Sequence, residues 1–116
     1  MVVDPAQSSD TDRLFRALGD ATRRDIVATV LVREHSVSAL ARRYPMSVAA
    51  VQKHVGVLER AGLVTRRRHG REQLVSGDAA ALHRARAALD RLEEQWRARM
   101  DRINDLLTDP DTGEQR

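Results

Sequence analysis

Two short helical patterns meet across a single proline in the middle of this chain, and this arrangement restricts the fold more than any other feature. Residues 36–44 and 47–61 each place apolar side chains at helical spacing. Only Pro45 and Met46 separate them, and Pro45 ends the first helix because proline lacks an amide hydrogen and disfavours helix in the residue before it. Ser36 and Ser47 stand where N-terminal helix caps are expected. Two short helices joined by so tight a turn resemble a helix-turn-helix.

The second of these helices, residues 47–61, has one buried face and one face that is free to contact another molecule. The buried face is expected to hold Val51, Val55 and Leu58. The early outward positions are Ala49, Gln52, Lys53 and Gly56. The glycine that follows the helix, Gly62, predicts a left-handed C-terminal cap.

The periodicity changes from helical to extended after Gly62. Residues 63–68 can run as one strand and residues 71–75 as a second, with His69 and Gly70 in the tight turn between them. A hairpin this small is too short to fold alone, so it must pack on the helices. The predicted fold class is therefore mainly α with a small β-hairpin wing.

Capping residues also mark the helices on either side. Thr11 is expected to begin a first short helix that Gly19 ends, and Asp20 then caps a second helix. The buried positions of that second helix are Ile26, Val27, Val30 and Leu31. Asp78 is expected to cap the last helix, and the absence of proline and glycine from there to Leu107 predicts one long helix.

These elements predict one domain with loose ends. With 116 residues the chain suits a single core, because two domains would leave each with little to bury. Residues 1–10 are expected to form a flexible arm and residues 108–116 a disordered tail. Residues 11–107 form the predicted domain, including the last helix at about 78–107.

The last helix carries an apolar stripe that is long for a helix covering one small domain. The stripe repeats every seven residues at Leu82, Leu89, Trp96 and Ile103. Companion positions are filled approximately by Ala85, Leu92, Met100 and Leu107. Heptad spacing is typical of helices that pair with other helices, so a helix from a second copy would account for it. The alternative is that the stripe covers the chain's own domain.

Charge is distributed unevenly along the chain. The formal net charge is +3, but residues 36–76 hold eight basic and two acidic side chains between slightly acidic flanks. Such a block indicates a surface for a polyanion, although charge alone also fits a solvated basic face. Phe15, Tyr44 and Trp96 are the only aromatic residues. RNA binding is not expected, because RNA-binding sheets and single-strand binders stack bases on aromatic side chains.

Composition argues against several other classes. The chain has no cysteine, so disulfides and thiolate metal sites are excluded. It has no apolar run of roughly 20 residues and no signal-peptide pattern at its start, so a cytoplasmic protein without a membrane partner is expected. It has no glycine-rich phosphate loop and no Ser-His-Asp set at a recognisable spacing. We therefore expect neither an enzyme nor a cofactor.

Several segments, taken together, resemble the ArsR/SmtB family of winged helix-turn-helix repressors. The segments are Leu18–Ile26, Val37–Ala41, Met46-Ser47, Ala50–Val64 and Gly70-Arg71. The match covers residues 11–76, with a weaker similarity in the last helix. Each segment alone is unspecific, but their order and spacing together are specific. The MarR-type winged helix has a similar core and usually a longer N-terminal helical region, for which this chain has little room.

The resemblance implies a homodimer on double-stranded DNA. In the family, the first and last helices pair the subunits, the recognition helix enters the major groove and the wing touches the flanking backbone or minor groove. The interface residues expected here are Leu14, Phe15, Leu18, Leu82, Leu89, Leu92, Trp96, Met100 and Ile103.

The predicted recognition helix offers five contact residues. Ser47 caps the helix and can also reach a phosphate. Val48 and Ala49 can offer only apolar contact, for example to a thymine methyl. Gln52 is the best candidate base reader, because its amide can bond adenine N6 and N7 together. The family usually has a small hydroxyl residue at this place, so an operator sequence cannot be carried over. Lys53 is expected to bind phosphate.

Further contacts are expected from His54 and from the wing. His54 matches a family histidine, and we expect it to bond backbone or phosphate rather than metal. Alternation along a strand sends side chains to both faces, so residues 66–68 cannot all point at DNA. Among the wing arginines, Arg67 and Arg71 are the preferred candidates and Arg68 is next.

The metal sites of the family are incomplete in this chain. One family site uses cysteines on the helix before the recognition helix, and residues 37–41 contain none. Another uses Asp, His, His and Glu on paired terminal helices, where this chain has a single histidine, His83. A weak site between His83 and Asp90 across a dimer is conceivable, but solvated charges on a long helix are the simpler interpretation. No metal is expected.

The sequence thus predicts a dimeric repressor that binds an inverted repeat in duplex DNA and occupies a promoter. Two other functions are compatible with the sequence. One is a winged-helix module that dimerises or docks on a protein partner without reading DNA, and the other is a metal-responsive repressor. No residue identifies an inducer.

Overall fold

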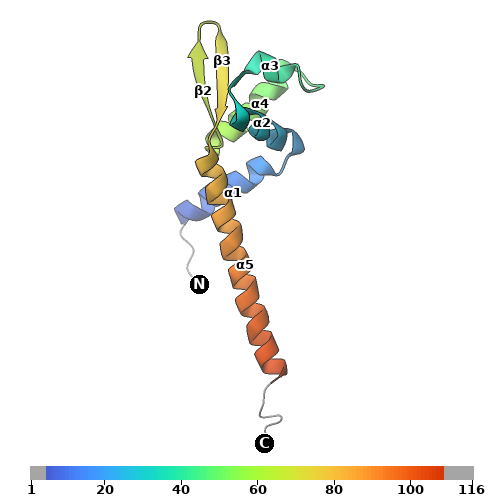
Figure 1. Ribbon diagram of the computed structural model, residues 1–116, viewed down its shortest axis with the longest axis vertical. Helices are drawn as coiled ribbons and strands as arrows, with labels where there is room; N and C mark the ends of the chain where they lie inside the picture. The colour runs from blue at the N-terminus through green and yellow to red at the C-terminus, as the bar shows by residue number, and fades with distance from the viewer. Residues whose placement is uncertain (1–4, 109–116) are drawn as a thin grey trace, which may run out of the picture. The chain divides into compact units, whose positions relative to one another are not determined.

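The computed structural model describes residues 5–108, with side chains described from Ser9 onward. The elements in this range are α1 (Pro5–Leu18), α2 (Ala21–Val32), β1 (His35–Ser36), α3 (Val37–Ala41), α4 (Val48–Arg60), β2 (Val64–His69), β3 (Glu72–Gly77) and α5 (Ala79–Leu107) (Figure 1). The chain divides into two compact units, residues 1–85 and 86–116. Within the described range, no helix has the length and apolar character that crossing a membrane requires.

Side-chain caps begin several helices, as predicted. Each cap oxygen accepts a hydrogen bond from a backbone N–H that helix geometry leaves without an intrahelical partner. The nitrogen-to-oxygen distances are 3.0 Å at Asp20, 3.0 Å at Ser36, 3.1 Å at Ser47 and 2.9 Å at Asp78. The backbone N–H of Arg23 also lowers the pKa of Asp20, because it bonds the charged carboxylate.

The first helix begins earlier than predicted. It starts at Pro5 rather than at Thr11, so the expectation of a flexible arm is wrong from residue 5 onward. Proline suits the first helical position because its φ is already helical and its missing N–H would have no partner there. Residues 1–4 and the predicted tail at 109–116 lie outside the described residues.

Two arginines of α2 close the carboxyl end of α1. Arg23 donates from Nε to the carbonyl of Ala17 at 2.8 Å and from Nη2 to the carbonyl of Arg16 at 2.9 Å. Arg24 donates to the carbonyl of Leu18 at 2.7 Å. Last-turn carbonyls carry partial negative charge, so these guanidinium groups stabilise the helix end electrostatically as well as by hydrogen bonding. The orientation between α1 and α2 is thereby fixed.

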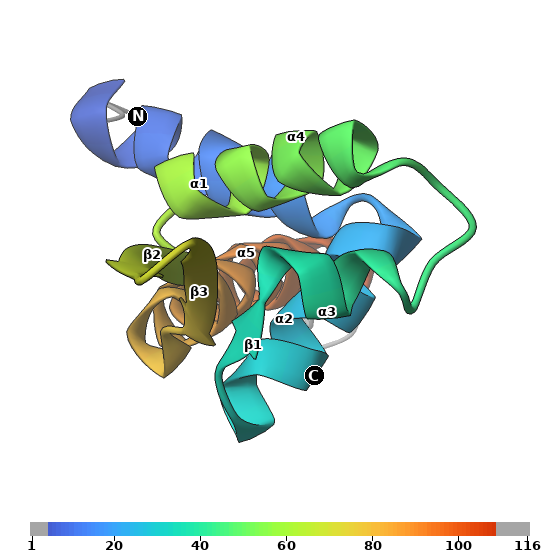
Figure 2. The ribbon, with the colours of Figure 1, turned by 90° about the horizontal axis from the view of Figure 1, so that it is seen from above.

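The core of the first unit lies between α1–α4, the sheet and the first turns of α5. Its largest buried side chains are Leu14, Ile26, Leu40, Leu58, Leu63, Val51, Val55, Val64 and Val75. Helix α4 packs against α1, α2 and α3 (Figure 2). The predicted buried face of α4 is confirmed. Two expectations are wrong: Leu31 is 37% exposed, and Gly56, predicted to face outward, is buried.

The connection between α3 and α4 is longer than predicted. Helix α3 ends at Ala41 rather than at Pro45, and residues 42–47 form the connection (Figure 2). Tyr44 in this connection donates its hydroxyl to Oδ2 of Asp25 on α2 at 2.6 Å. Burial, together with this carboxylate, raises the pKa of Tyr44. The bond attaches the connection to the body of the unit.

A third strand, not predicted from the sequence, widens the sheet at its base. The strand order is β1-β3-β2, and both pairings are antiparallel. His35 is in β1 and pairs with Val75. At the end of β3, a Cβ on Gly77 would lie 2.7 Å from Cδ2 of Leu31. The base of the sheet therefore packs closely on α2.

The wing is the hairpin of β2 and β3. His69 pairs with Glu72, so the turn consists of Gly70 and Arg71 and the predicted turn at His69-Gly70 is wrong by one residue. Gly70 has a φ of +63°, a conformation that a two-residue hairpin turn commonly needs. Arg71 thus lies at the turn itself and is exposed.

Helix α5 is one continuous helix over the predicted range. Its residues in the second unit are exposed from Leu89 to Thr108. The exposed fractions along the stripe are 54% for Leu89, 60% for Leu92, 59% for Trp96, 38% for Met100 and 41% for Ile103. The predicted domain at 11–107 extends across the division between the two units.

Candidate nucleic-acid interface

The N-terminal turns of α4 form an accessible surface. Val48 is 51% exposed, and Ala49 and Lys53 are exposed beside it. The Oγ atom of Ser47 accepts from the N–H of Ala50, which leaves the hydroxyl hydrogen free to donate to a phosphate. A helix N-terminus carries partial positive charge, so this end of α4 is suited to approach a nucleic-acid backbone.

Gln52 is held by a network between α4 and the wing. Nη1 of Arg66 donates to Oε1 of Gln52 at 3.0 Å. The same guanidinium donates to Oε1 of Glu59 from Nη2 at 2.8 Å and from Nε at 3.1 Å. A guanidinium has no acceptor, so the Gln52 atom facing it must be the carbonyl oxygen. The amide nitrogen of Gln52 is then left to donate to another molecule.

His54 connects α4 with α2 rather than with backbone. Its Nδ1 lies 3.3 Å from Nη1 of Arg23, the arginine that closes α1. Because arginine only donates, Nδ1 is the acceptor and the ring proton lies on Nε2. Among the described residues no hydrogen bond joins His54 to backbone, and an Nε2–H donor to phosphate stays a prediction.

The wing arginines have unequal surroundings. Arg67 is held by Glu34 through two bonds of 2.9 and 3.1 Å, and Ser76 donates to the same carboxylate at 2.8 Å. These bonds lower the pKa of Glu34. Arg68 and Arg71 are exposed and form no ion pair with any side chain described from Ser9 onward. Arg71 and Arg68 thus replace Arg67 as the wing cations most available to a partner.

Comparison with known proteins places this geometry in a family. A family model described as a helix-turn-helix domain matches residues 18–67. The HTH-type transcriptional regulator Rv2034 of Mycobacterium tuberculosis is 40% identical over 80 residues, which cover 69% of this chain and 75% of the relative. An ArsR-like transcriptional regulator from Rhodococcus sp. RHA1 is 31% identical, with a TM-score of 0.76 over 87% of this chain and 95% of that structure.

The chain belongs to the ArsR-type winged helix-turn-helix transcriptional regulators. A winged helix-turn-helix domain from Mycobacterium bovis, whose solution structure is described as homodimeric, shares the fold at 22% identity and a TM-score of 0.63, over 82% of this chain and 92% of that one. In this ArsR-type regulator the helix-turn-helix consists of α3 and α4, and the wing is the β2–β3 hairpin.

The interface residues expected on α1 and on the first turn of α5 fall into two groups. Leu14 is 1% exposed and belongs to the protomer's own core. The prediction that it contacts a second subunit is therefore wrong. Phe15 is 36% exposed, and Leu18 and Leu82 are partly buried against the core. The surface of α1 that remains for a partner is therefore centred on Phe15.

Metal ligands do not gather in the described part of the regulator. Among residues 5–108, no group of three or more His, Cys, Asp or Glu side chains is close enough to hold an ion. His83 is exposed on α5. The donor set of the family's metal sites is therefore not assembled within a single described chain.

The structure adds two residues that hold candidate contact residues in place and that the sequence did not single out. Arg66 positions Gln52, and Arg23 positions His54, yet the partners are 14 and 31 residues apart in sequence. The opposite charges of Glu59 and Arg66, on either side of the Gly62 turn, were a sequence signal that could have indicated the contact of Arg66 with α4. No sequence pattern indicated the second.

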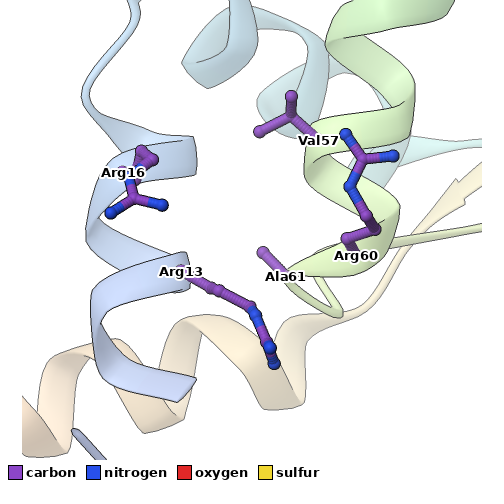
Figure 3. Close-up of a pocket in the computed structure, with 5 residues that line it drawn as sticks. All are labelled: Arg13, Arg16, Val57, Arg60 and Ala61. Carbon is purple, nitrogen blue, oxygen red and sulfur yellow. The ribbon is translucent and has the colours of Figure 1, made fainter. Parts of the chain in front are cut away.

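A further group of cations lies away from this surface. Arg13 and Arg16 of α1 and Arg60 of α4 line a hollow together with Val57 and Ala61 (Figure 3). The α1 arginines lie outside the basic block at 36–76. The distribution of charge along the sequence therefore gave no indication that they lie near Arg60.

Proposed function

We propose that this regulator is a repressor that binds, in the cytoplasm, an inverted-repeat operator in duplex DNA as a homodimer and prevents transcription by occupying the promoter. The observation that carries the proposal is the exposed, Ser47-capped start of α4 beside a wing whose Arg68 and Arg71 are free of ion pairs among the described side chains. The function requires no catalytic step.

Base reading and backbone binding are divided between different residues. Gln52, Val48 and Ala49 are the proposed base contacts, since they lie on the first turns of a helix that fits the major groove. Lys53 and Arg71 are proposed to bind phosphates, as is Arg68. These contacts supply affinity and carry little sequence information.

Dimerisation is supported by the exposed stripe of α5. Apolar side chains that recur at helical spacing and stay exposed are typical of a helix that pairs with another. The Mycobacterium bovis domain with the same fold is described as homodimeric. A symmetric dimer presents two recognition helices, which is the reason for expecting an inverted repeat.

The test is selection of bound fragments from the source genome by the purified protein, followed by gel shift at rising salt. The expected result is an enriched inverted repeat whose retention falls with salt. Absence of salt-sensitive retention would favour the alternative, a winged-helix module that docks on a protein. Operator affinity is expected to stay the same on adding zinc, nickel or arsenite, and a change would favour the metal-responsive alternative.

A further inference from the structure

Three arginines line a hollow between the first helix and the recognition helix. The hollow measures about 200 Å³ and is lined by Arg13 and Arg16 of α1 and by Arg60, Val57 and Ala61 of α4 and its end. Figure 3 shows the arginine side chains on opposite sides of the hollow, with the two apolar residues on the α4 side.

The positive charge of this hollow is not neutralised by the described part of the chain. None of the ion pairs among side chains from Ser9 onward includes Arg13, Arg16 or Arg60. Guanidinium groups stay protonated at any physiological pH, so the hollow keeps its positive charge. An anion in the hollow would therefore be attracted by its lining.

The lining indicates the chemical class of that anion. Guanidinium forks match the paired oxygens of carboxylates and phosphates. Val57 is half-buried and Ala61 is buried, so a short hydrocarbon part could pack on this side. The hollow is smaller than the roughly 300–1,000 Å³ typical of pockets for drug-sized ligands. We propose that it binds a small dianion, either a phosphate-bearing molecule or a short dicarboxylate.

The location gives such binding a regulatory consequence, which rests on the proposed function. The ligand would bridge α1, expected to pair the subunits, and the carboxyl end of α4, whose other end is expected to read DNA. An anion held by both helices changes the preferred spacing of α4 relative to α1. In a dimer, this alters the geometry between the two recognition helices and therefore operator affinity.

The first experiment measures binding without DNA. Full-length protein is titrated calorimetrically with inorganic phosphate and, separately, with succinate, at constant ionic strength set with chloride. We expect saturable binding of one ligand per chain, weakened about tenfold or more by Arg13→Ala and by Arg60→Ala. Arg33→Ala removes the same charge at an exposed position elsewhere and should leave binding unchanged. The stronger of the two ligands identifies the class.

Two results would overturn the site. One is the absence of saturable binding of either anion. The other is equal weakening by all three arginine variants, which would show general counterion attraction only. If wild-type protein binds neither anion while Arg13→Ala and Arg60→Ala weaken the dimer, the hollow serves a second copy's carboxylates instead.

The second experiment tests regulation through operator affinity. At constant ionic strength, the anion that binds should change the operator affinity of wild-type protein at least fivefold. The same anion should leave the operator affinity of Arg60→Ala unchanged. If the anion binds and operator affinity does not change, the regulatory role is overturned and the site stands. If no operator is found at all, the proposed function fails, and the binding titration still decides the site.

Discussion

The guanidinium of Arg66 donates to Oε1 of Gln52 at 3.0 Å while Glu59 holds the same guanidinium at 2.8 Å. The carbonyl oxygen of the residue proposed to read a base is thus already bonded to the wing. A glutamine that reads adenine uses both its oxygen and its nitrogen, whereas this one has its two amide hydrogens available. We expect it to favour a base edge that only accepts, such as guanine O6 and N7.

Base selection with variants tests this orientation. Gln52→Ala should relax preference at one position per half-site by about 1–3 kcal/mol without changing the salt dependence. Arg66→Met frees the carbonyl oxygen and should admit adenine at the same position. Arg68→Met removes the same charge without touching Gln52 and should leave that preference intact. Wild-type selection of adenine there, unaltered in Arg66→Met, would show that the wing does not set the orientation.

The salt dependence of operator binding should separate the wing arginines. Arg71→Ala removes one free cation per subunit, so the slope of log K against log salt should flatten by about 2 for a dimer. Arg67→Ala removes a cation already held by Glu34, and its effect on the slope should be clearly smaller. Fluorescence titrations at several salt concentrations measure both. Equal slopes for the two variants would contradict this difference in availability.

Dimer formation should depend on the exposed stripe of α5. Leu89→Asp places a charge in the proposed seam and should yield monomers with weak operator binding, because each monomer reaches one half-site. Ala98→Asp adds the same charge on the opposite face of the helix, at 100° per residue, and should stay dimeric. Light scattering at micromolar concentration decides between them, and a monomeric wild-type protein would disprove the seam.

Acid should destabilise the attachment between wing and body. The pKa of Glu34 is lowered chiefly by hydrogen bonds from Arg67 and then from Ser76, so its folded-state value is below its unfolded value. The stability it contributes is present above the ordinary value of 4.5 and is lost as pH falls through the folded pKa. Thermal unfolding of Glu34→Gln should therefore show a shallower acid decline than wild type. An unchanged decline would mean that Glu34 does not contribute.

Removing Arg23 should destabilise the fold more than removing an ordinary surface arginine. Its guanidinium bonds two carbonyls at the end of α1 and approaches His54 on α4. Arg23→Ala is expected to lower the free energy of unfolding by about 1–2 kcal/mol. Arg33→Ala should change it by less than about 0.5 kcal/mol. Urea denaturation measures both, and similar losses would show that these bonds add nothing.

Local sequence signals predicted most of the helices and strands. Asp20, Ser36 and Ser47 cap their helices where expected, because a side-chain oxygen three residues before a free N–H is a purely local device. The errors arose where contacts between distant parts of the chain determine the local structure. Strand β1 exists because His35 pairs with Val75, and no signal near His35 contains that information.

The candidate site was predictable in position but not in its bonding. The exposed first turns of α4 follow from periodicity and from the cap at Ser47. That Arg67 would be held by Glu34 and Arg66 by Glu59 depends on which strand face meets which element. Alternation along the strand predicted that neighbouring arginines point to opposite faces. Only the packed structure shows which of them is held in an ion pair and which is not.

Two glycines of the wing differ in what evolution can place there. Gly70 has a φ of +63° with no atom within 4 Å of a would-be Cβ, so asparagine, which tolerates this backbone region, is an acceptable substitute. Gly77 is constrained by space, since Leu31 occupies the position of any side chain. A saturation library should therefore tolerate a few residues at 70 and almost none at 77. Because the backbone Cα of Leu31 also lies 2.9 Å from that Cβ, a smaller residue at 31 would not make room, and position 77 is expected to stay glycine.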